Sequence, residues 1–168
     1  VFKHANYAGT SKHGGVLVVA GDDHAASSSS LPNQSDHEFA SAMMPVLAPA
    51  NVQEYLDLGL HGWAMSRYSG CWVGFKVVNE TIEQTATVDI SLDKVRIERP
   101  DTGPLPPEGI HYKGVYNPQN DEIILKRSKL PLARKFARAN RLDRVAFGVA
   151  NASPASGPAS GAGAPVGR

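Results

Sequence analysis

The sequence predicts an α/β fold in which helices cover both faces of a mostly parallel sheet. The short apolar runs Val16–Ala20 and Cys71–Val78 have the composition of strands that are buried on both faces. Between them lie two segments with helical features and one more short apolar run, so strand and helix alternate from Val16 to Val78. This alternation is typical of a parallel sheet joined by crossover helices.

Two short helices are expected on either side of the first strand. The first has apolar residues at helical spacing and then two glycines that end it: Phe2, Ala5 and Ala8, followed by Gly14 and Gly15. The second is expected over residues 37–44, because Ser35 and Glu38 have the spacing of a capping box and Pro45 ends the helix. Residues 45–49, bounded by prolines, are expected to form the next short strand.

The longest predicted helix begins after Asn51, a favourable N-cap residue, and ends at Gly70. Glu54 in the first turn and Arg67 in the last turn suit the helix dipole. One apolar face recurs at helical spacing: Val52, Leu56, Leu60 and Trp63. These residues therefore indicate an amphipathic helix between the second and third strands.

The remainder of the chain is divided by composition. Residues 1–95 form the α/β part, and the alternation over 85–100 suggests one or two edge strands. Residues 96–130 form a proline-rich excursion with short strands, and residues 131–146 a basic amphipathic helix. A solvated helix face is the simpler interpretation of these charges, and binding to an acidic partner is the alternative. The Ala/Ser/Gly/Pro tail over 147–168 is expected to be disordered.

Composition limits the classes of function. A chain of 168 residues with net charge +1 has no global electrostatic reason to bind nucleic acid or a membrane. The single cysteine, Cys71, is expected to be a buried, inert thiol and fits a reducing, cytoplasmic environment. No apolar run approaches the ~20 residues that span a bilayer, and no signal peptide is visible.

The loop "GDDHAASSSS", residues 21–30, is the main candidate for chemistry. It follows a predicted parallel strand at its carboxyl end, where α/β proteins bind ligands. Its polar groups could contact a ligand, or its aspartates could cap backbone N–H groups in a turn. We expect no metal site, because adjacent residues rarely converge on one ion. Nucleotide-binding and serine-hydrolase motifs are absent from the sequence.

Several segments of the sequence, taken in order, resemble those of a known protein family. They are "GDDH", "SSSSLPNQSDHEFA", "PVLAPANVQEYLDLGLHGWAMSRYSGCWVGFK" and "KLPLARKFARANRLDR". Together they resemble the fused indolepyruvate ferredoxin oxidoreductases, which are thiamine-diphosphate-dependent 2-oxoacid:ferredoxin oxidoreductases. The resemblance covers roughly residues 1–147.

This resemblance implies that the chain is the latter, incomplete part of a thiamine pyrimidine-binding domain. The family reaction is the oxidative decarboxylation of an aryl 2-oxoacid, with coenzyme A as acyl acceptor and ferredoxin as electron acceptor. The cofactors of the parent enzyme are thiamine diphosphate with Mg²⁺ and an iron–sulfur cluster. We expect the parent to be a cytoplasmic homo-oligomer and this piece to be inactive alone, because three features of the family lie outside it. These are the activating glutamate, the diphosphate motif and the cysteine clusters.

Carried over position by position, the resemblance places one stretch of loop and helix beside the thiamine and substrate cleft. The residues are Asp22, Asp23, His24, Ser28, Ser29, Gln34, Ser35 and His37. Ser28, Ser29 and His37 are the expected contacts to substrate or pyrimidine, and no residue is assigned a proton-transfer role. Two other interpretations stay open: a non-catalytic or degenerate α/β interaction module, and a small-molecule-binding α/β domain unrelated to thiamine.

Overall fold

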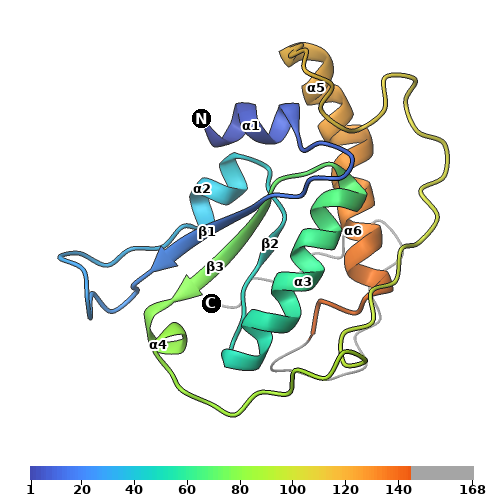
Figure 1. The fold of residues 1–168 in the computed structure, drawn as a ribbon. Helices are drawn as coiled ribbons and strands as arrows, with labels where there is room; N and C mark the ends of the chain where they lie inside the picture. Colours follow the sequence, from blue (N-terminus) through green and yellow to red (C-terminus); the bar gives the residue numbers. More distant parts are fainter. Residues whose placement is uncertain (145–168) are drawn as a thin grey trace, which may run out of the picture.

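A small parallel sheet forms the centre of the protein (Figure 1). The computed structural model describes residues 1–144, and its three strands lie in the order β1-β3-β2. The strands are β1 (Leu17–Asp22), β2 (Val46–Leu47) and β3 (Val73–Val78). Both pairings are parallel, with Leu17 opposite Val73 and Val46 opposite Gly74. The predicted mixed α/β class with a parallel sheet is confirmed.

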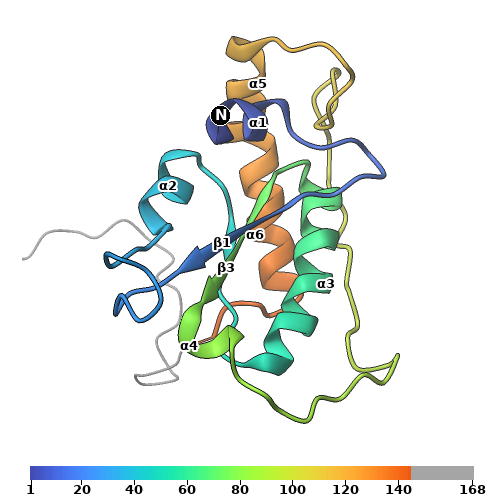
Figure 2. The same cartoon turned by 60° about the vertical axis from the view of Figure 1, so that its left-hand side comes forward.

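Helices lie on both faces of this sheet (Figure 2). The α-helices within residues 1–144 are α1 (Phe2–Ala8), α2 (Asp36–Ser41), α3 (Val52–Ser69), α4 (Asn79–Ile82), α5 (Pro118–Ile124) and α6 (Leu130–Ala139). On one face, α2 packs its Phe39 ring against Gly74 of β3, where a side chain would come within 3.0 Å of the ring. On the other face, α3 and α6 build the main core around Phe75 and Phe136. None of the helices within residues 1–144 is both long and apolar enough to cross a bilayer.

Helix α3 begins and ends at the residues that the sequence predicts. The Asn51 side chain accepts a hydrogen bond from the backbone N–H of Glu54 at 3.0 Å. Gly70 ends the helix in the left-handed conformation, with φ of 78°, and a side chain there would collide with the Ile110 carbonyl. The ends of α3 could be predicted from the sequence because the backbone groups that each capping residue satisfies lie within one helical turn of it.

The side of α3 that faces the core differs from the predicted one. Leu56, Leu60 and Trp63 are 45%, 55% and 48% exposed, whereas Ala64 and Met65 are buried. Small residues such as Gly62 allow the helix to approach Leu17 and Leu47 closely. The apolar stripe that the sequence shows therefore lies beside the sheet rather than over it.

The prediction of strands after β3 is wrong, because residues 83–117 form no strand. Ile90 and Leu92 are 79% and 98% exposed, so the alternation of this segment does not reflect a buried face. Its backbone is held by side chains instead: Gln53 bonds both the N–H and the carbonyl of Asp89. A strand needs a neighbouring edge in register, and this segment pairs with neither edge of the sheet.

The C-terminal helix begins earlier and ends earlier than its predicted bounds of 131–146. It starts at Pro118, after the N-cap Asn117, and ends at Ala139. A π-helical turn, Leu125–Lys129, joins α5 to α6 directly before Pro131. Proline has no N–H for the α-helical bond to residue 127, which accounts for the wider turn there. The tail predicted to be disordered, 147–168, lies outside the described residues.

Candidate functional site

A charged cluster of two buried residues and one exposed carboxylate lies at the carboxyl end of β1 and β3. Asp22 ends β1, Lys76 lies within β3, and Asp36 begins α2. The Lys76 ammonium is 3.1 Å from the Asp22 carboxylate and also contacts Asp36. Asp22 is 2% exposed and Lys76 is 8% exposed. One cation therefore joins two strands and the helix on the α2 face of the sheet.

The partners in this cluster keep each other charged. Burial alone would raise the pKa of Asp22, but the hydrogen bond from the Ser35 N–H and the nearby positive charge of Lys76 hold that pKa below its usual value. Burial would also lower the pKa of Lys76, yet its hydrogen bond to Asp36 and its ion pair with Asp22 raise that pKa instead. Lys76 is consequently a permanent ammonium at neutral pH, which makes it unsuitable as an amine nucleophile.

The serine loop is organised around the carboxylate of Asp23. This carboxylate accepts hydrogen bonds from the backbone N–H groups of Ser27, Ser28 and Ser29 at 2.7–2.8 Å. The Ser29 hydroxyl donates a fourth bond at 2.9 Å. These bonds, led by the one from Ser28, hold the pKa of Asp23 far below its usual value. Asp23 therefore acts as the turn-capping aspartate that the sequence left open as an alternative.

The serine and histidine residues of the loop are exposed, although the Ser28 and Ser29 hydroxyls also bond the Asp23 carboxylate. Ser28 and Ser29 are exposed, and the Ser28 hydroxyl also contacts Asn79 at 3.3 Å. The His24 side chain is 45% exposed, with its Nε2 atom 3.6 Å from the Asp22 carboxylate. Gln34 is exposed next to this loop. The Ser35 hydroxyl is buried and makes no hydrogen bond within the described part of the chain.

His37 is separated from this group. It is exposed on α2 and lines a hollow of about 440 Å³ with residues 1–3 of the chain. The structure thus brings together Asp22, Asp23, His24, Ser28, Ser29 and Ser35, and it places His37 beside α1.

Two members of the cluster, Lys76 and Asp36, were missed by the sequence interpretation. Lys76 is the single charge in the apolar run "CWVGFKVV". A charge inside a buried strand requires a partner of opposite sign, so this residue could have indicated a carboxylate nearby. The identity of that carboxylate could not be read from the sequence, because Asp36 lies 40 residues earlier.

A metal ion fits this cluster poorly. Ligand atoms of Asp22, His24 and Asp36 lie within 4.8 Å of one another. However, the Lys76 ammonium contacts both carboxylates and already supplies the positive charge that a cation would bring.

The cofactors implied by the resemblance also do not fit the described residues alone. The Asp23 carboxylate occupies the N–H donors of the serine loop and would repel a diphosphate. An iron–sulfur cluster needs several thiolates, whereas Cys71 is the only cysteine and is fully buried. Burial raises the pKa of this thiol to about 11. The loop thus presents one imidazole and two serine hydroxyls that also bond Asp23.

No family model, curated protein or solved structure matches this chain. The geometry of the loop and the sequence resemblance are therefore the grounds for a functional proposal.

Proposed function

We propose that this chain forms one wall of the thiamine and substrate cleft of an aryl 2-oxoacid:ferredoxin oxidoreductase. The observation that carries the proposal is the loop at the carboxyl end of the parallel strands. It presents the exposed Ser28, Ser29 and His24 side chains on a frame fixed by buried carboxylates. Ligands of parallel α/β folds bind at this edge of the sheet.

In this proposal the residues of the chain orient a ligand rather than transfer protons. Thiamine diphosphate, when bound, supplies the nucleophilic ylid and the electron sink. The hydroxyl oxygens of Ser28 and Ser29, whose protons are directed to Asp23, would accept hydrogen bonds from the substrate or the pyrimidine, and Lys76 would hold the loop in place. Other parts of the parent would provide the Mg²⁺–diphosphate site and the iron–sulfur ligands. Coenzyme A and ferredoxin would be partners of that cytoplasmic parent, not of this chain alone.

A non-catalytic α/β interaction module is the second candidate. The observation that favours it is the apolar stripe of α3, where Leu56, Leu60 and Trp63 are exposed beside the sheet. The internal use of the loop donors by Asp23 is also consistent with a purely structural loop.

The DNA on both sides of the coding segment distinguishes these candidates. An open frame that continues into the activating glutamate, a diphosphate motif and cysteine clusters would support the oxidoreductase. Stop codons close to both ends in every frame would contradict it and favour the interaction module.

Calorimetric titration of the chain with thiamine diphosphate and Mg²⁺ tests whether this chain alone can bind the cofactor. We expect no measurable binding, because the described donors are already bonded to Asp23. Micromolar binding would contradict this account of the site.

A further inference from the structure

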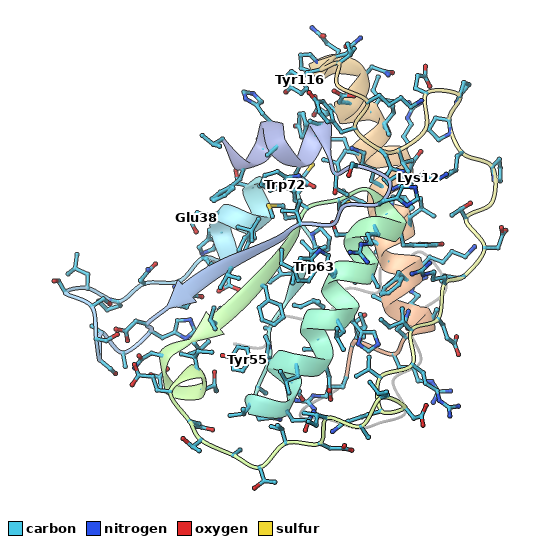
Figure 3. The ribbon with its side chains drawn as sticks, viewed as in Figure 1. Lys12, Glu38, Tyr55, Trp63, Trp72 and Tyr116 are labelled. Carbon is cyan, nitrogen blue, oxygen red and sulfur yellow. The ribbon has the colours of Figure 1, made fainter. Side chains whose placement is uncertain are left out.

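One edge of the sheet is flanked by a large apolar groove. Strand β1 is first in the order β1-β3-β2, so its outer side has no strand neighbour within residues 1–144. Val19, in the middle of this strand, is 65% exposed. The groove beside it has a volume of about 550 Å³ and is lined by Leu17, Val19, Tyr55, Leu56, Leu60 and Trp63, among others. Figure 3 shows Tyr55 and Trp63 on the α3 side of the sheet.

The backbone groups on this edge are available for pairing. The Val73 N–H bonds the Val16 carbonyl, which turns the alternate residues Val16, Val18 and Ala20 toward β3. The N–H and carbonyl groups of Leu17 and Val19 consequently point outward. The Gly21 carbonyl is contacted by the Asn33 side chain at 3.4 Å, which marks the end of the open edge.

This edge has none of the features that prevent strands from pairing. The stretch Leu17–Gly21 contains no charged residue and no proline. Natural edge strands are usually protected by lysines, prolines or bulges. An unprotected edge beside an apolar groove favours the addition of another strand.

The charges at the two ends of the edge favour a second copy in antiparallel orientation. The exposed Lys12 and His13 precede the start of β1. At the other end, Asp22 pairs with Val78 of β3, and the exposed Glu80 and Glu83 follow directly. Antiparallel pairing about a two-fold axis would place the basic end of each copy against the acidic end of the other. Parallel pairing would bring like charges together.

We propose that two copies of this chain associate through antiparallel pairing of their β1 strands. Val19 of one copy lies opposite the partner's Val19, and Leu17 lies opposite the partner's Gly21. The two sheets then become one sheet of six strands, and the two apolar grooves meet over it between the α3 helices. This inference does not depend on the proposed enzymatic function.

The oligomeric state of the full chain and of two matched variants tests the proposal by light scattering after size exclusion. We expect twice the chain mass for the wild type and a single chain mass for V19K, because a charge on the β1 edge opposes pairing. V46K is the control, since Val46 is a 38% exposed residue on β2, the opposite edge of the sheet. This variant is expected to remain a dimer, and circular dichroism verifies that each variant is folded. A monomeric wild type, a series of larger species, or equal effects of V19K and V46K would overturn the proposal.

A charge exchange tests the orientation independently of any change in the strand. K12E is expected to raise the Kd of the dimer by about tenfold at low salt, because two symmetric contacts are lost. Adding E80K should restore the wild-type Kd. If K12E leaves the Kd unchanged, or E80K fails to restore it, the antiparallel arrangement is wrong.

Discussion

The Lys76 ammonium lies 3.1 Å from the Asp22 carboxylate and contacts Asp36 as well, so one side chain connects β1, β3 and α2. The carboxylate of Asp22 is fully buried, and Lys76 is the cation that compensates it. The start of the loop that follows Asp22 is therefore held in place by contacts with β1, β3 and α2. These contacts determine where the residues of the candidate site lie relative to the sheet.

Replacing Lys76 by methionine should destabilise the protein by about 3–5 kcal/mol, because the Asp22 carboxylate would remain buried without the lysine charge that compensates it. Urea unfolding at pH 7 measures this loss of free energy. The control is K94M, since Lys94 lies 3.9 Å from Asp57 and Asp89 and its side chain is 29% exposed. That control should cost at most about 1 kcal/mol. Equal losses in the two variants would show that the buried cluster contributes little.

Local signals predicted much of the fold. Asn51 and Gly70 marked the ends of α3 because the groups they satisfy lie in adjacent turns. The apolar runs also predicted β1 and β3, because a strand that is buried on both faces appears in the sequence as an uninterrupted run of apolar residues. By contrast, alternation over 85–100 predicted strands that do not form, because alternation says nothing of whether a sheet edge lies in register.

The position of the candidate loop in the fold was predictable, but the roles of its two aspartates were not. The sequence predicted correctly that this loop follows the carboxyl end of a parallel strand, which is the edge where ligands of α/β folds bind. It could not divide the roles of two adjacent aspartates, of which Asp22 binds Lys76 and Asp23 binds the serine amides. That division depends on the direction of each side chain at the end of β1, and on a lysine more than 50 residues away in the sequence.

The carboxylate of Asp23 should remain ionised in acid, and the serine loop should keep its structure with it. The hydrogen bonds from Ser28, Ser27 and Ser29 hold its pKa below the ordinary 3.8. The stabilisation they give is complete above pH 3.8 and is lost only as the pH falls through the lower pKa of the folded state. The amide proton shifts of these serines, followed by NMR, should therefore change little from pH 7 to pH 3.8. D23N should move all three shifts at pH 7, and a titration midpoint near 3.8 would contradict the observed bonding.

Cys71 should be unreactive in the folded protein. Burial raises the pKa of its thiol from 9.0 to about 11, so almost no thiolate is present at pH 8. Ellman's reagent should label it slowly in buffer and rapidly in guanidinium chloride. A S30C/C71A variant provides an exposed thiol as control, since Ser30 is exposed. Rapid labelling of native Cys71 would contradict its burial.

The same thiol should make stability fall at high pH. A raised pKa in the folded state means that the contribution is complete below pH 9.0 and is lost as the pH rises toward about 11. The free energy of unfolding of the wild type should thus decrease relative to that of C71A across this range, by at most about 3 kcal/mol. Parallel curves for the two proteins would show that Cys71 does not titrate differently on unfolding.

Gly9 connects α1 to the rest of the fold, and its substitution should be far more costly than that of another glycine. Its φ of 84° and ψ of −160° lie in a region that only glycine adopts readily. A side chain there would also come within 2.5 Å of the Gly70 carbonyl and of the Lys129 ammonium. That ammonium donates to the Tyr7 carbonyl at 2.8 Å, so displacing it would release the end of α1.

We therefore expect G9A to lose at least about 1–3 kcal/mol of stability from backbone strain alone. G59A is the matched control, because a side chain at Gly59 within α3 meets nothing within 4 Å. It should gain up to about 1 kcal/mol, since alanine favours the helical state over glycine. Urea unfolding of both variants measures the difference, and hydrogen exchange over residues 5–9 reports whether α1 is released. Similar stabilities for G9A and G59A would mean that the contact between α1 and Lys129 does not hold this helix in place.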